Sequence, residues 1–451
     1  MKYRPYTLKN YHNIPQLKFM RGTAVSDIDV VGRVLPFKTN NYVVDELIDW
    51  DNYENDPLFT INFPQKKLID RENFDLISGL LKSGADNAVI NQAVEGVRLG
   101  LNPHPAGQLE CNVPEMDGSK VGGIQHKYDE TMLVFPAQGQ TCHAYCTFCF
   151  RWPQFTGMSD YKMALKQAEV AAEYLKRHPE ITDVLFSGGD PMVMSAGRLE
   201  IYIDALLNSG YSNLKTIRIG TKSLSFWPYR YLTDKDSEKI LELFRKVTDS
   251  GIHLSIMAHM NHYREMSTAA FREAVKRIRQ TGAVIRSQSP VLNHVNSSSA
   301  IWEKMWVDQV NIGIIPYYMF VPRNTGSHRF FSIPLVKAYD IYRKAFSHVS
   351  GLARTVRGPS MSALHGKIKI DGIPEINGKK YIAMSFIQGR SSDWVKKPFF
   401  AEYNEKACWI NELKPAFGNK IFFFERDEFE PLGFDECNDE TEVLSYAIAL
   451  N

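Results

Sequence analysis

The central part of the chain alternates short apolar segments with longer amphipathic ones. Each short segment is typical of a buried strand, and each segment that follows has apolar residues at helical spacing. The pattern predicts strands at residues 131–135, 182–186, 215–219, 253–258, 283–288 and 312–320. It predicts helices at residues 163–177, 198–207, 237–249, 268–281, 300–310 and 334–346. Six successive strand–helix units favour an α/β fold with a parallel sheet covered by helices, and they are too few for a closed eight-stranded barrel.

The segments on either side of this region have other patterns. Before it, residues 74–81 and 87–99 have helical periodicity, and residues 102–123 are rich in Pro and Gly and predict a loop. After it the pattern is mixed, with strands expected at residues 380–386 and 421–424. We therefore divide the chain into a largely helical N-terminal extension (1–127), the strand–helix region (128–346), a C-terminal segment (347–400) and an acidic tail (401–451).

The composition is that of a globular protein. The chain has 451 residues, of which 44% are hydrophobic, and its net charge is +2. Such a balanced charge gives no indication of a surface for nucleic acid or membranes. There is no apolar run of about 18 residues that would predict a membrane span, and the first residues lack the apolar core of a signal peptide. We expect a soluble cytoplasmic protein that binds neither nucleic acid nor membranes.

Three cysteines after the first predicted strand carry the most specific signal in the chain. Cys142, Cys146 and Cys149 lie in one short loop, separated by three and then by two residues. Three thiolates on such a loop can hold three irons of a cubane iron–sulfur cluster and leave the fourth iron open to a small molecule. The alternatives are a structural zinc site, which normally has four ligands, and three unreactive buried thiols.

The spacing of these cysteines resembles that of radical S-adenosylmethionine (SAM) enzymes. The resemblance implies a [4Fe–4S] cluster that binds SAM at its open iron, and one electron that cleaves SAM to methionine and a 5′-deoxyadenosyl radical. It also implies a partial (β/α)6 barrel and an electron donor such as flavodoxin or ferredoxin. Barrel enzymes have their working groups at the carboxyl ends of the strands, where this loop is expected to lie.

A second loop, Ser187-Gly188-Gly189-Asp190, follows the second predicted strand. Glycines allow the backbone to approach a ligand closely, although most glycine pairs at strand ends are only turns. In radical SAM enzymes a Gly-Gly-Glu or Gly-Gly-Asp segment at this place contacts the amino group of SAM. The resemblance therefore makes these four residues candidates for SAM binding. The third strand ends in Arg218-Ile-Gly-Thr221, which either lines the same cavity or turns the chain.

As a set, the motifs resemble one family in particular, the lysine 2,3-aminomutases. The matching segments are Asp56-Pro-Leu-Phe, Gln125-His-Lys-Tyr128, the cysteine loop through Arg151, Phe186-Ser-Gly-Gly-Asp-Pro191, Ile217-Arg-Ile-Gly-Thr221, His259-Met-Asn-His262, Ser287-Gln-Ser289 with Val295-Asn296, Pro316-Tyr-Tyr318 and His348-Val-Ser-Gly351. The resemblance implies an enzyme that carries pyridoxal phosphate (PLP) on a lysine and converts an α-amino acid into a β-amino acid.

The resemblance also indicates which residues bind PLP. In the family, the catalytic lysine that carries PLP lies 16 positions after the glycine of a Ser-Gly pair, and counting from Gly351 leads to Lys367. The alternative is that Lys367 is a solvated lysine like its neighbour Lys369. Gln288 matches a family glutamine near the PLP phosphate.

Two departures from the family pattern concern this cofactor. The run of glycines that usually precedes the lysine is Ser362-Ala-Leu-His-Gly366 here. The arginine that binds the PLP phosphate in the family corresponds to Glu130 or Thr131, and this change removes a charge-assisted contact.

Three further positions suggest the chemistry of the substrate. Arg151 matches the family arginine that binds the α-carboxylate of the substrate, a contact that suits the planar guanidinium group, although it could also be a surface residue. The two aspartates that hold the side-chain ammonium of lysine correspond to Arg323 and Ser360. Because Arg323 would repel an ammonium group, we expect an amino acid with an acidic or neutral side chain.

Other interpretations stay open at this point. An enzyme of the same ancestry could have lost PLP and catalyse a dehydrogenation or an epimerisation. The chain could also be a non-catalytic iron–sulfur sensor, although a sensor needs no SAM segment. Cys408 and Cys437 are isolated, so the zinc site of the family is not expected. The expected partners are a small amino-acid substrate and an electron donor, and assembly into a homo-oligomer stays open.

Overall fold

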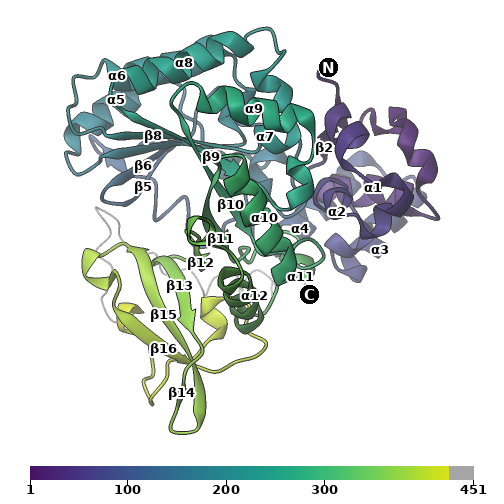
Figure 1. The fold of residues 1–451 in the computed structure, drawn as a ribbon. Coiled ribbons are helices and arrows are strands. Elements are labelled where there is room, and N and C mark those ends of the chain that lie inside the picture. Colours follow the sequence, from purple (N-terminus) through teal and green to yellow (C-terminus); the bar gives the residue numbers. More distant parts are fainter. Residues whose placement is uncertain (426–451) are drawn as a thin grey trace.

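One large mixed sheet runs through most of the computed structural model, which describes residues 1–425 (Figure 1). Its strands are β5 (Ile124–Tyr128), β6 (Thr131–Val134), β7 (Asp183–Phe186), β8 (Thr216–Thr221), β9 (His253–His259), β10 (Val284–Pro290), β11 (Ile315–Phe320), β12 (Arg357–Ser362), β13 (Gly366–Gly372), β14 (Glu375–Ile376), β15 (Lys379–Gly389) and β16 (Pro398–Glu402). The strands from β6 to β12 are parallel and follow chain order. The carboxyl ends of these strands therefore lie at one edge of the sheet.

A helix follows each of the six predicted parallel strands. The helices of this region are α5 (Ala168–Arg177), α6 (Ala196–Leu207), α7 (Ser223–Phe226), α8 (Ser237–Asp249), α9 (Ala269–Arg279), α10 (Ser299–Asn311), α11 (His328–Phe331) and α12 (Leu335–Ser347). The α/β class and the six strand–helix units are thus confirmed. Helix α5 begins five residues later than predicted, because Leu165 instead forms a β-bridge with Pro136.

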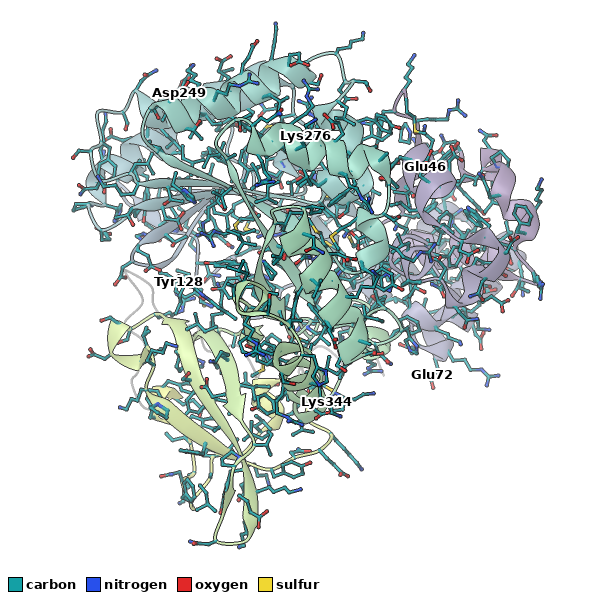
Figure 2. All side chains as sticks on the ribbon, in the orientation of Figure 1. Glu46, Glu72, Tyr128, Asp249, Lys276 and Lys344 are labelled. Atoms are coloured by element: carbon teal, nitrogen blue, oxygen red, sulfur yellow. The ribbon has the colours of Figure 1, made fainter. Side chains whose placement is uncertain are left out.

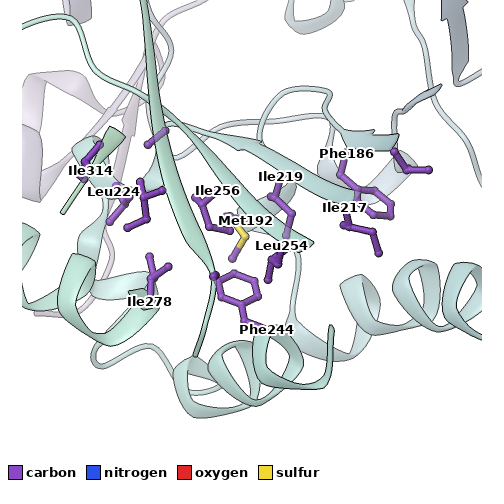
Figure 3. Close-up of a cluster of buried hydrophobic side chains, with 14 of the residues drawn as sticks. Phe186, Met192, Ile217, Ile219, Leu224, Phe244, Leu254, Ile256, Ile278 and Ile314 are labelled. Atoms are coloured by element: carbon purple, nitrogen blue, oxygen red, sulfur yellow. The ribbon is translucent and has the colours of Figure 1, made fainter. Parts of the chain in front are cut away.

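The strands alternate between a face that packs on these helices and a face that does not. On β8, Ile217 and Ile219 are fully buried, whereas Arg218 between them is half-buried. Figure 3 shows Ile219, Leu254 and Ile256 extending from the strands toward the helices, where Phe244 of α8 faces them. Burying a side chain of this size stabilises the fold by about 1.5–3 kcal/mol. The opposite face of the sheet remains available for polar side chains.

The chain before the sheet folds into a mainly helical extension, drawn in purple in Figure 1. Its elements are β1 (Pro5–Thr7), α1 (Ala24–Val34), β2 (Lys38–Asn40), α2 (Pro57–Asn62), α3 (Arg71–Lys82), α4 (Asn87–Gly100), β3 (Glu115–Met116) and β4 (Ser119–Lys120). The two predicted helices are present as α3 and α4. The Asp56-Pro-Leu-Phe segment begins α2, because the Asp56 carboxylate accepts hydrogen bonds from the N–H groups of Leu58 and Phe59.

After β12, four antiparallel strands extend the sheet beyond its parallel part. The predicted strand at residues 380–386 is present as β15. The strand predicted at residues 421–424 is wrong, since the chain there forms the 3-10 helix η15 (Phe423–Glu425). The rings of Phe422 and Phe424 stack with their centroids 5.3 Å apart and are buried against Phe399, so aromatic packing accounts for this apolar run.

The rest of the predicted acidic tail, residues 426–451, lies outside the described residues. Within residues 1–425, none of the helices has the length and apolar character needed to cross a membrane.

Candidate functional site

The cysteine loop, residues 140–151, follows β6 at the carboxyl edge of the sheet and is held from outside by the N-terminal extension. The N–H of Tyr145 donates to the carbonyl of Lys38 on β2 over 2.7 Å, and the N–H of Thr147 donates to the carbonyl of Ile61 on α2 over 2.9 Å. Trp152, the residue directly after the loop, is buried in the same apolar cluster as side chains of the extension's helices. The extension therefore positions the loop.

The three predicted metal ligands are close enough to influence each other electrostatically. Burial and the neighbouring groups Asp190, Cys149 and Cys146 raise the pKa of Cys142 well above its usual value. Burial likewise raises the pKa of Cys146, and that of Cys149 to about 11. All three are free thiols. Holding three thiolates here requires nearby positive charge, which bound iron would supply.

The arrangement of these sulfurs does not suit a single ion. Thiolates bound to one tetrahedral zinc would lie about 3.8 Å apart, as follows from a zinc–sulfur distance of about 2.3 Å. In residues 1–425, three such ligand atoms gather within 4.8 Å only at His126, His178 and Glu180, not at the cysteines. Both ring nitrogens of His126 already have partners, Tyr174 and the carbonyl of Asp129. A polynuclear cluster, whose ligands bind different irons, fits the cysteine loop better.

The glycines of the second loop let it press against the cysteine loop. Gly188 has a φ of +138°, and a Cβ on Gly189 would lie 2.4 Å from the carbonyl oxygen of Thr141. The N–H of Asp190 donates to that same oxygen over 2.7 Å, and the N–H of Gly189 donates to the carbonyl of Gly139 over 3.1 Å. These glycines thus allow the Ser187–Asp190 loop to contact the backbone of the cysteine loop.

The carboxylate of Asp190 joins the segment that follows β7 to the end of β8. It accepts hydrogen bonds from the hydroxyl of Thr221 and from the N–H groups of Met192 and Lys222, over 2.7–2.9 Å. Burial raises its pKa to about 6. Its role here is to fix the Ser187–Asp190 loop against the end of β8. Any contact with SAM from this loop would come from groups other than this carboxylate.

A buried ion pair beside the cysteines escaped the sequence analysis. The ammonium of Lys222 donates to the carboxylate of Glu265 over 2.7 Å and to the side-chain oxygen of Asn261 over 2.9 Å. The positive charge of Lys222 lowers the pKa of Cys146 against the effect of burial. Asn261 belongs to His259-Met-Asn-His262, one of the segments that resemble the lysine 2,3-aminomutase family. That resemblance was the one signal in the sequence that could have indicated the contacts of Lys222.

Arg151 and Arg323 come together around one aromatic ring. Their guanidinium carbons lie 5.1 and 4.5 Å from the ring centroid of Phe150. Burial and the charge of Arg323 lower the pKa of Arg151 to about 9, and burial lowers that of Arg323 to about 10. Within residues 1–425 neither side chain forms an ion pair, and the Nη1 atom of each is buried without a hydrogen-bond partner. Such orphaned donors are suited to an anionic ligand.

Ser360 is a further predicted site residue with an unpaired polar group, and Lys127 is a further cation near Arg323. The hydroxyl of Ser360 is fully buried and, within the described part of the chain, has no hydrogen-bond partner. The Lys127 ammonium contacts the carbonyl of Ala363. Burial and the positive charges of Arg390, Arg323 and Lys367 lower the pKa of Lys127 well below its usual value. The structure thus gathers Lys127, Arg323 and Lys367 in one region of like charge.

Lys367 lies at the start of β13, beside the same region. Its ammonium donates to the side-chain oxygen of Gln388 over 2.9 Å and to the hydroxyl of Tyr318 over 3.5 Å. It lies 4.6 Å from the ring centroid of Tyr318 and 5.7 Å from that of Tyr128. Burial and nearby Arg218 lower its pKa to about 8. Tyr128 lies between the strand–helix region and the C-terminal strands in Figure 2.

Two neighbours of Lys367 complete the sequence-predicted set. Gly366 stands where the family usually has the last of a run of glycines. It is needed for strand pairing, because a Cβ there would lie 2.4 Å from the carbonyl oxygen of Gln388 on β15. Gln288 lies on β10, in register with His259 on one side and with Tyr318 on the other. The sheet therefore brings Gln288 next to the strand that contacts Lys367.

Comparison with known proteins identifies relatives along most of the chain. A protein of Aquifex aeolicus named "Putative L-lysine 2,3-aminomutase" is 30% identical over 389 residues, which are 86% of this chain and 90% of that protein. The L-lysine 2,3-aminomutase of Bacillus subtilis is 28% identical over 339 residues, 74% of this chain and 66% of that enzyme. No protein-family model matches the chain.

Similar solved structures are more distant. Streptococcus suis SuiB bound to its precursor peptide SuiA has a TM-score of 0.34 at 13% identity, over 60% of this chain and 56% of that one. A radical SAM methyltransferase from Sphaerobacter thermophilus has a TM-score of 0.31 at 15% identity, over 64% of this chain and 93% of that one. Scores this low do not bear on the function.

A three-cysteine loop after the first strand of a parallel α/β sheet is the arrangement of a radical SAM enzyme, and this is the class that the fold and the site define. At a finer level, the chain belongs to the lysine 2,3-aminomutase family, since the alignment with the Aquifex protein spans nine-tenths of that relative.

The contact between the two loops can be tested by adding one methyl group. In Gly189→Ala the new Cβ would overlap the backbone of Thr141, so we expect a displaced cysteine loop and a destabilisation of about 1–3 kcal/mol. Iron bound per chain after anaerobic reconstitution should fall severalfold. The control is Gly197→Ala on α6, where no heavy atom lies within 4 Å. Equal iron loading in the two variants would show that the contact does not position the cysteines.

Proposed function

We propose that this protein is a PLP-dependent 2,3-aminomutase that uses a [4Fe–4S] cluster and SAM and acts on an α-amino acid with an acidic or neutral side chain. Among these, the site favours an acidic one. The observation that supports this most strongly is the pair of buried, unpaired guanidinium nitrogens on Arg151 and Arg323, together with the unpaired hydroxyl of Ser360. Family membership supports the reaction class.

Cys142, Cys146 and Cys149 would hold the cluster. Their chemistry fits, because burial raises the pKa of all three thiols, so thiolates on this one loop are favourable only next to a strong positive charge. When bound, the cluster supplies the electron that makes SAM a source of a hydrogen-abstracting radical. We further propose that Ser187, Gly188, Gly189 and Asp190 adjoin SAM, that the parallel strands form a partial barrel around it, and that a flavodoxin or ferredoxin delivers the electron.

Lys367 would hold PLP. Its ammonium has a lowered pKa of about 8, so a substantial fraction is a neutral amine near physiological pH. The flat rings of Tyr318 and Tyr128 lie beside it and suit an aromatic cofactor. When bound, PLP provides the π-system that lets nitrogen move between neighbouring carbons. Gln288, which pairs with Tyr318 across the sheet, would lie near the PLP phosphate, as its family position implies.

The two arginines would bind the two ends of the substrate. Arg151 would take the α-carboxylate, as its family position implies, and Arg323 would take a carboxylate on the side chain. Both guanidinium groups contact Phe150, so one small molecule can reach both. Two carboxylates would relieve the mutual repulsion that lowers the pKa of Arg151. An ammonium side chain would add a charge where Arg323 and Lys127 already repel each other.

The cluster assignment can be tested with a matched pair of cysteine variants. Cys146→Ala removes one of three ligands and should abolish iron loading and the cleavage of SAM to 5′-deoxyadenosine. Cys408→Ala removes a free thiol of the C-terminal part and should change neither. The measurement is iron content and deoxyadenosine after anaerobic reconstitution with dithionite. Continued SAM cleavage in Cys146→Ala would rule out the assignment.

The PLP assignment predicts an unusual pH dependence. The amine of Lys367 condenses with the aldehyde of PLP with loss of water, and borohydride then makes the link permanent by adding hydride. Only the neutral amine reacts, so capture should be half-maximal near pH 8, nearly complete about one pH unit higher, and should fall as the pH drops below 8. Mass spectrometry of peptides locates the adduct. Lys367→Arg should abolish capture, whereas Lys369→Arg, which alters a lysine paired with Asp371, should not. A midpoint near 10.5, or capture at other lysines only, would speak against this role.

Charge reversal at Arg323 should change the choice of substrate. In Arg323→Asp an acidic amino acid would meet a carboxylate instead of a guanidinium, so its KM should rise by at least about 30-fold, as expected for losing a buried charge pair. Lysine turnover should improve over the wild type. Arg329→Asp, six residues further along and exposed, is the control. An unchanged substrate preference in Arg323→Asp would mean that Arg323 does not face the side chain of the substrate.

A further inference from the structure

A cavity opens at the amino ends of the parallel strands, on the face of the sheet that the helices leave free. Its volume is about 290 Å³. Neighbouring strands each contribute polar side chains to its wall: Asp183, Arg218, Arg286, Tyr317, Tyr318 and Arg357. Three of these residues are arginines, and the cavity adjoins Lys367, which contacts Tyr318 and Gln388 of its lining.

Only one of these arginines has an acidic partner among the described residues. Arg218 pairs with Asp183 on the neighbouring strand through its Nε atom, 2.8 Å from the carboxylate, and through a second contact. Arg286 and Arg357 form no ion pair within residues 1–425 and instead lie over the ring of Tyr317, with guanidinium carbons 5.3 and 4.9 Å from its centroid. The one further acid of the wall, Glu130, accepts a hydrogen bond from Gln388 over 2.5 Å. Two guanidinium groups therefore share one wall of the cavity without a carboxylate between them.

One hydroxyl group links Arg357 to Lys367. The Nη1 atom of Arg357 and the ammonium nitrogen of Lys367 each lie 3.5 Å from the hydroxyl oxygen of Tyr318. The two nitrogens are therefore at most about 7 Å apart. In PLP the aldehyde and the phosphate ester stand on neighbouring ring carbons. An amine that reacts with the aldehyde and a cation that binds the phosphate must therefore lie within a few ångströms of each other, as Lys367 and Arg357 do.

The family arginine for the PLP phosphate corresponds to Glu130 or Thr131 in this chain, and neither is a cation. A phosphate monoester without a cation would lose its strongest contact. Arg286 reaches the cavity from β10 and Arg357 from β12, so neither occupies the place of the missing residue, and both reach the region beside Lys367 from other strands.

We propose that Arg286 and Arg357 bind the phosphate of PLP and replace the missing arginine. This inference rests on the proposed function, because it requires PLP at Lys367. A separate phosphate-bearing ligand could use the same two arginines, and the experiment must distinguish the two.

The test compares PLP with pyridoxal, which lacks the phosphate, on the full-length protein. Each compound is titrated, trapped by borohydride and quantified as adduct on Lys367. The wild type should capture PLP at a concentration at least about tenfold lower than pyridoxal. Arg286→Gln and Arg357→Gln should each reduce this preference severalfold while pyridoxal is still captured, and that capture also shows that the variants fold. The ratio cancels any effect of the variants on the pKa of Lys367.

The controls separate the possible failures. Arg245→Gln, an exposed position on α8, should keep the wild-type preference. Inorganic phosphate should compete with PLP, but not with pyridoxal, in the wild type. An unchanged PLP preference in both arginine variants would overturn this inference and leave the proposed function intact. Binding of inorganic phosphate that does not compete with PLP would have the same two consequences. Adduct on Lys367 from neither compound would overturn the proposed function and this inference with it.

Discussion

The backbone contact between the two loops at the carboxyl edge of the sheet is the constraint on which the site depends. The N–H of Asp190 reaches the carbonyl of Thr141, one residue before the first cysteine, and Gly189 leaves no room for a side chain there. On the other side, Lys38 and Ile61 of the N-terminal extension hold the same loop. A loop of three cysteines is thus fixed from both sides before any iron binds, and this preorganisation lowers the entropic cost of forming a cluster.

The second constraint is electrostatic. Burying Arg151, Arg323 and Lys127 near each other costs free energy, because each loses water and each repels the others. Nothing within residues 1–425 forms an ion pair with Arg151 or Arg323. Anionic ligands would recover this free energy, whereas a cationic substrate would add to the repulsion. Unpaired positive charge is also present on the other side of Lys367, where the guanidinium groups of Arg286 and Arg357 both lie over the ring of Tyr317.

Periodicity alone gave most of the sheet and helices correctly, because buried strands and amphipathic helices follow the local pattern of apolar residues. It failed at residues 421–424, where stacked phenylalanines bury an apolar run without strand pairing. Periodicity could not predict contacts between segments that are far apart in the sequence. Three features depend on which segments become neighbours in the fold. They are the ion pair of Lys222 and Glu265, the hydrogen bonds from the N-terminal extension to the cysteine loop, and the arginines that β10 and β12 bring into one cavity. Family resemblance indicated Lys367 and Arg323, but only the fold brought them into one charged region.

The central claim is that the enzyme moves the amino group of an acidic amino acid. The most direct measurement is an anaerobic screen of the twenty common amino acids with the reconstituted cluster, dithionite, SAM and PLP, in which each product is analysed for a β-amino isomer. The account predicts an isomer from glutamate or another acidic amino acid and little or none from lysine. Efficient isomerisation of lysine, or 5′-deoxyadenosine formed without any isomer, would contradict it.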